Sequence, residues 1–525
     1  PACGSGNFLT ETYLSLRRLE NEIMPIIGDL FNPIKVDIHQ FYGIEINDFA
    51  VATATTALWI AEAQMMAQTE RLMHINLDFL PLKRYHNIIE GNALRMDWKP
   101  LFFEDEATTI VADKTHLYPG AEGFGKSLLN DPVIKYGEIN LYTKEMDFSP
   151  RTTEKKEIDF DYIIGNPPFI GYSLQSGEQK EDILSIFKDE KGRTYSTAGK
   201  IDYVAGWYWK AAEYMAGTAK TVRTALVSTN SITQGEQVAA IWKPLYERFG
   251  IHIDFAWRTF RWDSESSLKA HVHCVIIGFS TAENTKPPIV YKTEGLLEDV
   301  CTNINPYLID AENVFIERVN KPLCEVPEMT TGNRPADGGH LIIEADEYAE
   351  FIRKEPDAIP FIKKLVGAQE FINNKKRYCL WLVGVSPARL RSMPEVMKRV
   401  HSCKENRESA PDPGRRKLAL TPHLFRETGN PDSFIIVPAT SSENRRYVPL
   451  GFLNGDTIST NANIIIPNAG LYHFGVLTSN VHMAWMRVVC GRLKSDYRYS
   501  KDIVYNNFPW CNPTDEQKAE IEKTA

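Results

Sequence analysis

The chain lacks the cysteine patterns of a disulfide scaffold or a structural zinc site. Its eight cysteines, at positions 3, 274, 301, 324, 379, 403, 490 and 511, are scattered along 525 residues, and none belongs to a Cys-x-x-Cys pair. Scattered cysteines are typical of proteins from a reducing compartment. We therefore expect a cytoplasmic protein that carries no metal site.

Long apolar runs are absent too. No stretch approaches the roughly 18 apolar residues of a membrane-spanning helix, and no signal peptide is recognisable. A membrane is therefore not expected among the partners. The first residue is Pro1 rather than Met, so we expect the chain to be a fragment of a longer protein.

Positive charge is in deficit over the whole chain but concentrated in one part of it. The net charge is −9, yet residues 371–505 hold 20 Lys or Arg and only 10 Asp or Glu, which leaves −19 for the remainder. An acidic part joined to a basic part indicates that the basic part follows the phosphates of a nucleic acid.

Three short motifs carry much of this basic character. They place charged side chains beside turn residues or an aromatic ring, which suits contacts with phosphates and base edges. These candidate DNA-binding residues are Lys375, Lys376, Arg377, Arg415, Arg416, Lys417, Glu443, Arg445 and Arg446.

The pattern of apolar residues predicts an α/β fold followed by other domains. Residues 1–280 alternate helical patterns with short apolar strands, which is typical of a parallel sheet with helices on both faces. Residues 101–156 read as an insertion without an assigned role. Residues 281–335, rich in Pro, Asn, Asp and Glu, are expected to connect this domain to a mixed α+β region at 336–470. A C-terminal helical segment is expected at 471–525.

Individual elements can be assigned within these regions. Helices are expected at residues 9–19, 49–68, 202–216 and 474–493. Strands are expected at residues 41–45, 162–165, 223–228, 251–257 and 271–279.

The motif Asn166-Pro167-Pro168-Phe169 is the most informative feature. It follows an apolar strand, and ligands bind at such strand ends in open α/β sheets. Two consecutive prolines remove two backbone donors and fix φ, so the turn is rigid. It can direct the Asn166 side-chain oxygen and the Pro167 carbonyl at one amino group, with Phe169 as a stacking face. The motif therefore predicts a site for an exocyclic amino group on a planar ring.

Three further strand ends carry polar or glycine-rich residues. The chain begins with Ala2-Cys3-Gly4-Ser5-Gly6-Asn7, in which Gly-x-Gly lets the backbone approach a ligand. A short strand then ends at Glu45, a carboxylate suited to ribose hydroxyls. Another apolar run ends at Asn92 and Ala93.

Together these four strand ends resemble the class I S-adenosylmethionine-dependent amino-methyltransferases of DNA. The resemblance implies a Rossmann-like seven-stranded sheet with helices on both faces and S-adenosyl-L-methionine as cofactor. It places Ala2, Cys3, Gly4, Ser5, Gly6 and Asn7 around the methionine part of the cofactor, Glu45 at the ribose, and Asn92 with Ala93 near the adenine.

The Asn-Pro-Pro-Phe motif also implies the acceptor. In this family the motif points to adenine N6 in a base flipped out of duplex DNA, with Asn166, Pro167, Pro168 and Phe169 as the catalytic residues. Cytosine N4 is the alternative acceptor, although Ser is commoner than Asn at the first position there. Cytosine C5 is poorly supported because the chain contains no Pro-Cys nucleophile.

The order of the parts resembles the γ arrangement, and further segments narrow the family. Residues 169–175, 257–262, 377–382 and 474–479 are similar to the single-chain type IIL (type IIG-like) restriction–modification enzymes. Those enzymes fuse a nuclease, a methyltransferase and a target-recognition domain. The resemblance implies double-stranded DNA as partner, target recognition by residues 336–470, and a nuclease and a cofactor-packing segment upstream of Pro1.

Other functions also fit parts of the sequence. Residues 120–127 fit the phosphate-loop pattern Gly-x4-Gly-Lys-Ser of an ATPase, but the nearest apolar run ends well before Gly120. RNA and protein-glutamine methyltransferases also use Asn-Pro-Pro-aromatic turns. A non-catalytic DNA-binding remnant is the remaining alternative.

Overall fold

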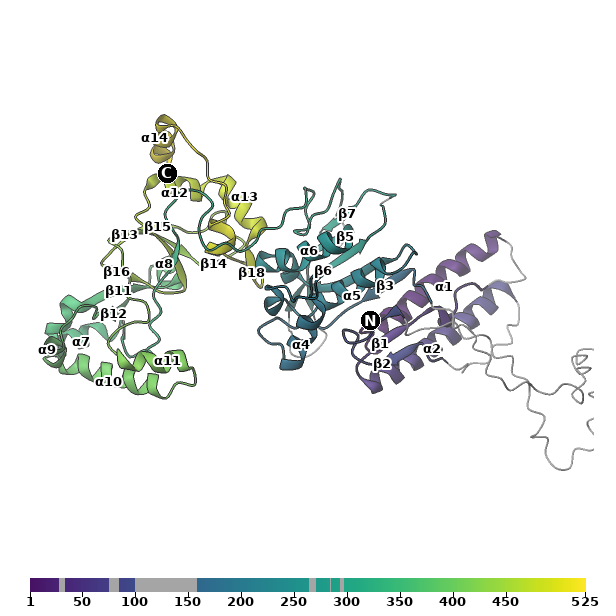
Figure 1. Ribbon diagram of the computed structural model, residues 1–525, viewed down its shortest axis with the longest axis horizontal. Helices are drawn as coiled ribbons and strands as arrows, with labels where there is room; N and C mark the ends of the chain where they lie inside the picture. Colours follow the sequence, from purple (N-terminus) through teal and green to yellow (C-terminus); the bar gives the residue numbers. More distant parts are fainter. Residues whose placement is uncertain (28–33, 75–84, 100–157, 264–270, 284, 293–296) are drawn as a thin grey trace, which may run out of the picture.

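The structure, a computed structural model, is shown in Figure 1. It describes residues 1–525 apart from 28–33, 75–84, 100–157, 264–270, 284 and 293–296. The predicted insertion and the phosphate-loop-like motif lie outside the described residues. In the described part, no helix combines the length and the apolar character needed to cross a membrane.

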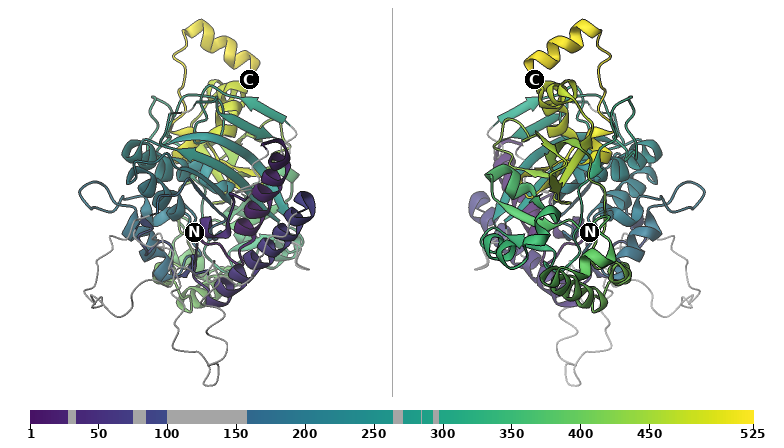
Figure 2. Two further views of the ribbon diagram at one scale, coloured as in Figure 1. Left: turned by 90° about the vertical axis from the view of Figure 1, so that its right-hand side faces the viewer. Right: turned by 90° about the vertical axis from the view of Figure 1, so that its left-hand side faces the viewer.

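The first part of the chain is an α/β arrangement. Its helices are α1 (Asn7–Ile27), α2 (Asp48–Met73), α4 (Gly177–Ile186), α5 (Ala205–Ala216) and α6 (Gly235–Phe249). Its strands are β1 (Gly43–Glu45), β2 (Ile88–Glu90), β3 (Tyr162–Gly165), β4 (Arg223–Thr229), β5 (His252–Asp263), β6 (His271–Ser280), β7 (Ile289–Lys292) and β8 (Leu297–Val300). Helices flank the strands on both sides in Figure 2, as predicted.

The predicted count of seven strands in one sheet is not confirmed. Among the described residues, β1 and β2 form a parallel pair, and six strands form a second sheet in the order β3-β4-β6-β5-β7-β8. The start of the chain runs between the two sheets. Cys3 N donates to Ile44 O of β1 (3.1 Å), and a Cβ on Gly165 of β3 would lie 3.0 Å from Pro1 O.

The six-stranded sheet extends past residue 280. Strand β7 pairs in parallel with β5, and β8 pairs antiparallel with β7. Both strands belong to the segment expected to connect two domains. That segment is therefore part of the sheet at its beginning, while the position of the domain boundary stays a prediction.

The C-terminal part is mixed α+β, as predicted. Its strands are β9 (Thr330–Thr331), β10 (Ile342–Glu344), β11 (Ile362–Val366), β12 (Arg377–Leu380), β13 (Ser433–Pro438), β14 (Thr440–Ser441), β15 (Gly451–Asn454), β16 (Thr457–Ser459), β17 (Asn463–Pro467), β18 (Gly491–Leu493) and β19 (Asp496–Arg498). They form the sheets β10-β12-β11-β16, β15-β13-β17-β9 and β14-β19-β18. Its helices are α7 (Tyr348–Lys354), α8 (Ala368–Asn373), α9 (Pro387–Arg391), α10 (Pro394–Glu408), α11 (Pro413–Lys417), α12 (Leu471–Thr478), α13 (Asn480–Val489) and α14 (Asp515–Thr524).

The prediction of one helix at residues 474–493 is wrong. The segment forms two helices, α12 and α13, and then the first strand of the hairpin β18–β19. The break occurs at Ser479, whose Oγ accepts a hydrogen bond from His482 N (3.2 Å) and so caps the start of α13. The predicted C-terminal helical segment thus also contains a β-hairpin.

Apolar packing runs from the α/β part into the C-terminal part. One buried cluster includes Trp209 and Ile277 of the first part together with Ile435 and Met483 of the second. A second buried apolar cluster forms the core of the lobe that contains α7, α9 and α10. This lobe and the α/β part lie toward opposite ends of the described chain in Figure 1.

Candidate active site

The Asn-Pro-Pro-Phe turn (residues 166–169) lies at the carboxyl end of β3. Asn166 Oδ1 is buried and has no hydrogen-bond partner among the described residues. Pro167 is buried, Pro168 is exposed, and Phe169 is half-buried. A buried acceptor without a donor costs about 1–3 kcal/mol. A ligand that offers an amino group to Asn166 would recover that cost.

A buried carboxylate holds the segment that follows the turn. Asp202, 7 % exposed, accepts hydrogen bonds from Tyr172 N (2.9 Å, at Oδ1) and Ser231 Oγ (2.6 Å, at Oδ2). Next to it, Tyr203 N donates to Ile170 O (2.9 Å). Asp202 thus joins the turn to residues that follow β4. Sequence reasoning missed Asp202, because the network links residues about 30 positions apart that share no motif.

The glycine-rich segment forms a tight turn at the end of β1. Gly6 has a φ of +85°, and a Cβ there would lie 2.8 Å from the Cβ of Ala54 in α2, so only glycine fits. Gly4 N donates to Glu45 Oε2 (2.8 Å), and Asn47 N donates to Glu45 Oε1 (3.2 Å). The predicted methionine-binding and ribose-binding residues therefore lie together.

Asn92 and Ala93 lie at the end of β2, where their polar groups already have partners. Asn92 Nδ2 donates to Asp182 Oδ2 (3.0 Å), and Asn92 Oδ1 accepts from Leu94 N (3.0 Å). Ala93 is 4 % exposed. Asn92 thus caps the turn in the described structure, and a contact with the cofactor adenine stays a prediction.

Asp182 of α4 connects this turn with the loop that holds the Asn-Pro-Pro-Phe turn. It is 4 % exposed and also accepts from Arg95 Nε (2.6 Å) and Tyr203 OH (2.8 Å). Burial, together with the bond to Asp182, raises the pKa of Tyr203, so its hydroxyl stays a donor. Two buried carboxylates, Asp182 and Asp202, therefore fix the walls of one region at the carboxyl ends of β2, β3 and β4.

The structure brings the predicted cofactor and catalytic sets to the same edge. Pairing within β1–β2 and within β3–β4 is parallel, so the carboxyl ends of each pair point the same way. Pro1 O lies beside Gly165, the residue directly before Asn166. The glycine-rich segment therefore runs next to the Asn-Pro-Pro-Phe turn, which is the geometry that a group-transfer site needs.

The predicted DNA-binding residues differ in how free their side chains are. Arg415 donates to Asn406 Oδ1 (2.6 Å), and Arg416 donates to the carbonyls of Ala410 and Pro411 (both 2.8 Å). Lys417 is exposed and has no ion pair or hydrogen bond of its side chain among the described residues.

The motif at the start of β12 shows the same division. Arg377 pairs with Glu344 (3.0 Å) and Glu370 (3.7 Å). Lys375 and Lys376 are exposed. In both motifs some cations hold the fold together while others face solvent.

The third motif lies beside the β18–β19 hairpin. Glu443 pairs with Arg492 (3.5 Å), and the guanidinium of Arg446 lies over the ring of Tyr447 (5.2 Å). Arg445 is exposed. The hairpin in turn contacts α6 of the α/β part, since a Cβ on Gly235 would lie 3.3 Å from Gly491 N.

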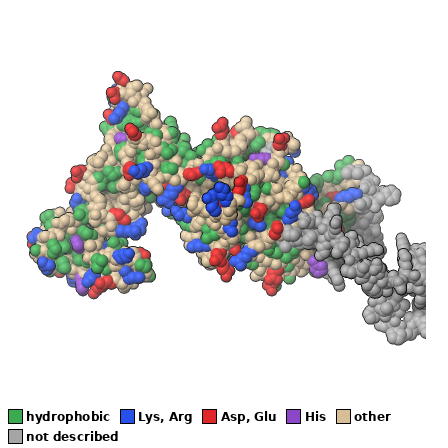
Figure 3. Space-filling model, in the orientation of Figure 1, with side chains coloured by type: hydrophobic (Ala, Val, Ile, Leu, Met, Phe, Trp, Pro, Cys, Tyr) green, Lys and Arg blue, Asp and Glu red, His purple; other side chains and the backbone are tan. Residues whose placement is uncertain are grey.

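Lys and Arg side chains gather around a recess in the surface. In Figure 3 the outline is hollowed between the lobe with α9–α11 and the α/β part, and blue side chains lie on both sides. A concave surface lined with cations favours a polyanion.

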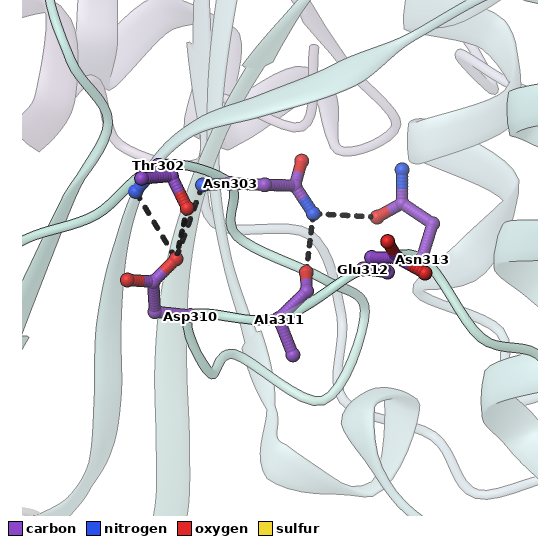
Figure 4. Close-up of a pocket in the computed structure, with 6 residues that line it drawn as sticks. All are labelled: Thr302, Asn303, Asp310, Ala311, Glu312 and Asn313. Carbon is purple, nitrogen blue, oxygen red and sulfur yellow. Dashed lines mark hydrogen bonds between the residues drawn. The ribbon is translucent and has the colours of Figure 1, made fainter.

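A separate hollow of about 490 Å³ lies on the loop after β8 and is shown in Figure 4. There Asp310 Oδ1 accepts from Thr302 N (3.0 Å), Thr302 Oγ1 (2.9 Å) and Asn303 N (3.2 Å). These bonds lower the pKa of Asp310. These hydrogen bonds all lie within the loop, so the hollow reflects how the loop closes on itself. No group of potential metal ligands is found in the described ranges.

Comparisons with known proteins agree with this geometry. Residues 1–292 match the DNA-methyltransferase domain of MmeI, and residues 310–512 match its target recognition domain. DNA methyltransferase A of Bacillus subtilis (strain 168) is 37 % identical over 530 residues, which cover 100 % of this chain and 53 % of that relative. The chain therefore spans about half the length of this curated relative.

A solved structure shares the fold. The type IIL restriction–modification enzyme MmeI, determined in complex with DNA, matches with a TM-score of 0.80 and 37 % identity, over 100 % of this chain and 63 % of that chain. These matches confirm the resemblance to type IIL enzymes that the sequence motifs indicated. The chain belongs to the MmeI family and contains its DNA-methyltransferase domain and its target recognition domain.

Proposed function

We propose that the chain is the modification part of a restriction–modification protein and methylates adenine N6 at a specific sequence in duplex DNA. The observation that carries this proposal is the buried, unpartnered Asn166 Oδ1 at the end of β3, directly before two prolines. Membership of the MmeI family supports DNA as the substrate.

The residues of the turn can do the work that amino methylation requires. The target amino group would donate to Asn166 Oδ1 and to the Pro167 carbonyl, and these bonds draw the nitrogen lone pair out of the ring. Phe169, half-buried beside them, offers a face on which the flipped base stacks. No protein nucleophile is needed, so positioning and electrostatics supply the rate.

S-adenosyl-L-methionine fits the residues at the neighbouring strand ends. Each Glu45 oxygen accepts one backbone hydrogen bond and keeps a lone pair, so the carboxylate can also accept from ribose hydroxyls. The turn at Gly4 and Gly6 exposes backbone to the methionine part. The bound cofactor would supply the methyl group, and Glu45 with this turn would hold it beside Asn166.

Duplex DNA is the proposed partner, with the recess in Figure 3 as its place. The exposed cations Lys375, Lys376, Lys417 and Arg445 are the side chains most available to phosphates. All eight cysteines are free thiols, which suits the reducing cytoplasm.

Methyl transfer from labelled S-adenosylmethionine to unmethylated bacterial DNA tests the proposal, with modified bases located by sequencing. N6-methyladenine in one sequence context is the expected result. Detection of N4-methylcytosine would show that cytosine N4, and not adenine N6, is the acceptor. Absence of any DNA methylation by the folded full-length protein would refute the proposal.

A further inference from the structure

A second buried amide lies at the end of the strand next to the Asn-Pro-Pro-Phe turn. Asn230 directly follows β4, which pairs in parallel with β3. It is 8 % exposed, and its Nδ2 is buried without a hydrogen-bond partner among the described residues. A buried donor left unpaired in a native fold calls for an explanation, and a ligand that supplies an acceptor is one.

The network around Asp202 holds Asn230 near the turn. Ser231, the next residue, donates to Asp202 Oδ2 (2.6 Å), while Tyr172 N donates to Asp202 Oδ1 (2.9 Å). The segments that follow β3 and β4 are therefore bound to one carboxylate. Asn166 and Asn230 stand at the carboxyl ends of neighbouring parallel strands, where ligands of such sheets bind.

The two amides offer complementary groups to a base. Asn166 leaves an acceptor unpaired, and Asn230 leaves a donor unpaired. An adenine ring presents the opposite pair, an amino group that donates beside a ring nitrogen that accepts, at N1 or at N7. Guanine O6 and thymine O4 would place an acceptor against Asn166 and are disfavoured.

We propose that Asn230 is a second base-binding residue, whose Nδ2 donates to the ring nitrogen beside the target amino group. The assignment rests on the proposed adenine methylation and deepens it. Asn230 would fix the rotation of the flipped base in its own plane, so that the amino nitrogen faces the methyl group. Asn230 would also disfavour bases that lack a ring nitrogen acceptor beside the amino group.

Isosteric substitution tests the role of the donor. Asn230→Asp keeps the shape but removes the donor, and Asn230→Ala removes the whole amide. Each should lower kcat/KM for methyl transfer by about tenfold or more, the cost of one lost hydrogen bond in a buried site. Asn21→Asp is the matched control, because Asn21 also has a buried unpaired Nδ2 but lies on α1, where its Oδ1 accepts from Thr69 Oγ1 (2.8 Å). The control should transfer at the wild-type rate.

Base analogues show whether the lost bond was made to the base. Duplexes carry 1-deazaadenine or 7-deazaadenine at the target position, so that one candidate acceptor is missing in each. For one analogue the ratio of wild-type to Asn230→Asp activity should fall from about ten to about one, because there is no bond left to lose. The ratio should persist for the other analogue.

Two results would overturn the inference: wild-type activity of both Asn230 variants on adenine, or the same ratio on all three substrates. Thermal melting of each variant separates loss of fold from loss of contact, and the analogue ratios within one variant do not depend on its folded fraction. Failure of the full-length wild-type protein to methylate adenine would instead refute the proposed function.

Discussion

Tyr172, three residues beyond Phe169, donates a hydrogen bond of 2.9 Å from its backbone nitrogen to Asp202 Oδ1. The carboxylate is buried and also accepts from Ser231, so it clamps the loop that carries the Asn-Pro-Pro-Phe turn against the residues after β4. We therefore expect Asp202 to be a positioning residue that acts through Tyr172 and Ser231.

Asp202→Ala should lower kcat strongly while leaving the Kd for DNA nearly unchanged. The loop loses its anchor because Tyr172 N loses its acceptor. A cost of about 1–3 kcal/mol corresponds to roughly a tenfold to hundredfold loss of rate if it falls on the transition state. Steady-state methylation at saturating substrate measures kcat, and fluorescence anisotropy measures DNA binding.

Asp202→Asn is the conservative partner of this variant. Its oxygen can still accept from Tyr172 N, and the Ser231 hydroxyl can accept from the new amide instead of donating. Most of kcat should therefore return. Equal activity of the Ala and Asn variants would show that the clamp does not position the turn.

Glu45→Gln should weaken S-adenosylmethionine binding by about tenfold, since charge-assisted hydrogen bonds to the ribose become neutral ones. Isothermal titration calorimetry of the folded protein gives the Kd. Glu90→Gln is the control, because Glu90 is the register partner of Glu45 at the end of the neighbouring strand and is exposed. Equal Kd values for both variants would remove Glu45 from the cofactor site.

Neutralising the exposed cations should weaken DNA binding and reduce its salt dependence. For Lys417→Ala and Arg445→Ala, each phosphate contact that is lost should lower the slope of log Kd against log salt by about 0.9. Arg416→Ala is the comparison, since its guanidinium already bonds to the carbonyls of Ala410 and Pro411. An unchanged slope for Lys417→Ala and Arg445→Ala would exclude both as phosphate contacts.

Arg407→Met should destabilise the lobe around α10. Arg407 is fully buried and donates five hydrogen bonds to backbone carbonyls, those of Pro335, Ala336, Leu418, Thr421 and Leu424. Removing the buried guanidinium takes the donor from all five carbonyls at once, at a cost of about 3 kcal/mol or more. Denaturant unfolding followed by tryptophan fluorescence measures the change, and a midpoint equal to that of the wild type would contradict it.

Local sequence patterns predicted many of the helices and strands. The apolar runs that predict strands at 162–165 and 223–228 correspond to β3 and β4, and the helix expected at 49–68 corresponds to α2. The number of strands in each sheet was harder to predict, because it depends on pairing between strands far apart in sequence. The single helix expected at 474–493 failed because Ser479 caps a new helix within a run that stays apolar on both sides.

In the candidate site, too, local motifs could be predicted and contacts between distant residues could not. The position of Asn166 follows from a rigid turn after a strand, so a motif is enough to find it. The partners of Asn92, Arg415 and Arg416 depend on which side chains the fold brings near, and Asp182 and Asn406 carry no signal that marks them as those partners. Asp202 and Asn230 belong to this second class. Pairing of β3 with β4 brings Asn230 to the turn, and hydrogen bonds from Tyr172 and Ser231 hold Asp202 there.

The most direct test of the central claim compares the wild-type protein with Asn166→Ala on unmethylated DNA, with N6-methyladenine read at single-base resolution. We expect methylation of one sequence by the wild type, and at least a hundredfold loss, on the order of the loss of a key transition-state contact, in a variant that binds DNA normally. Full methylation by Asn166→Ala would contradict the assignment of Asn166 as the residue that holds the target amino group.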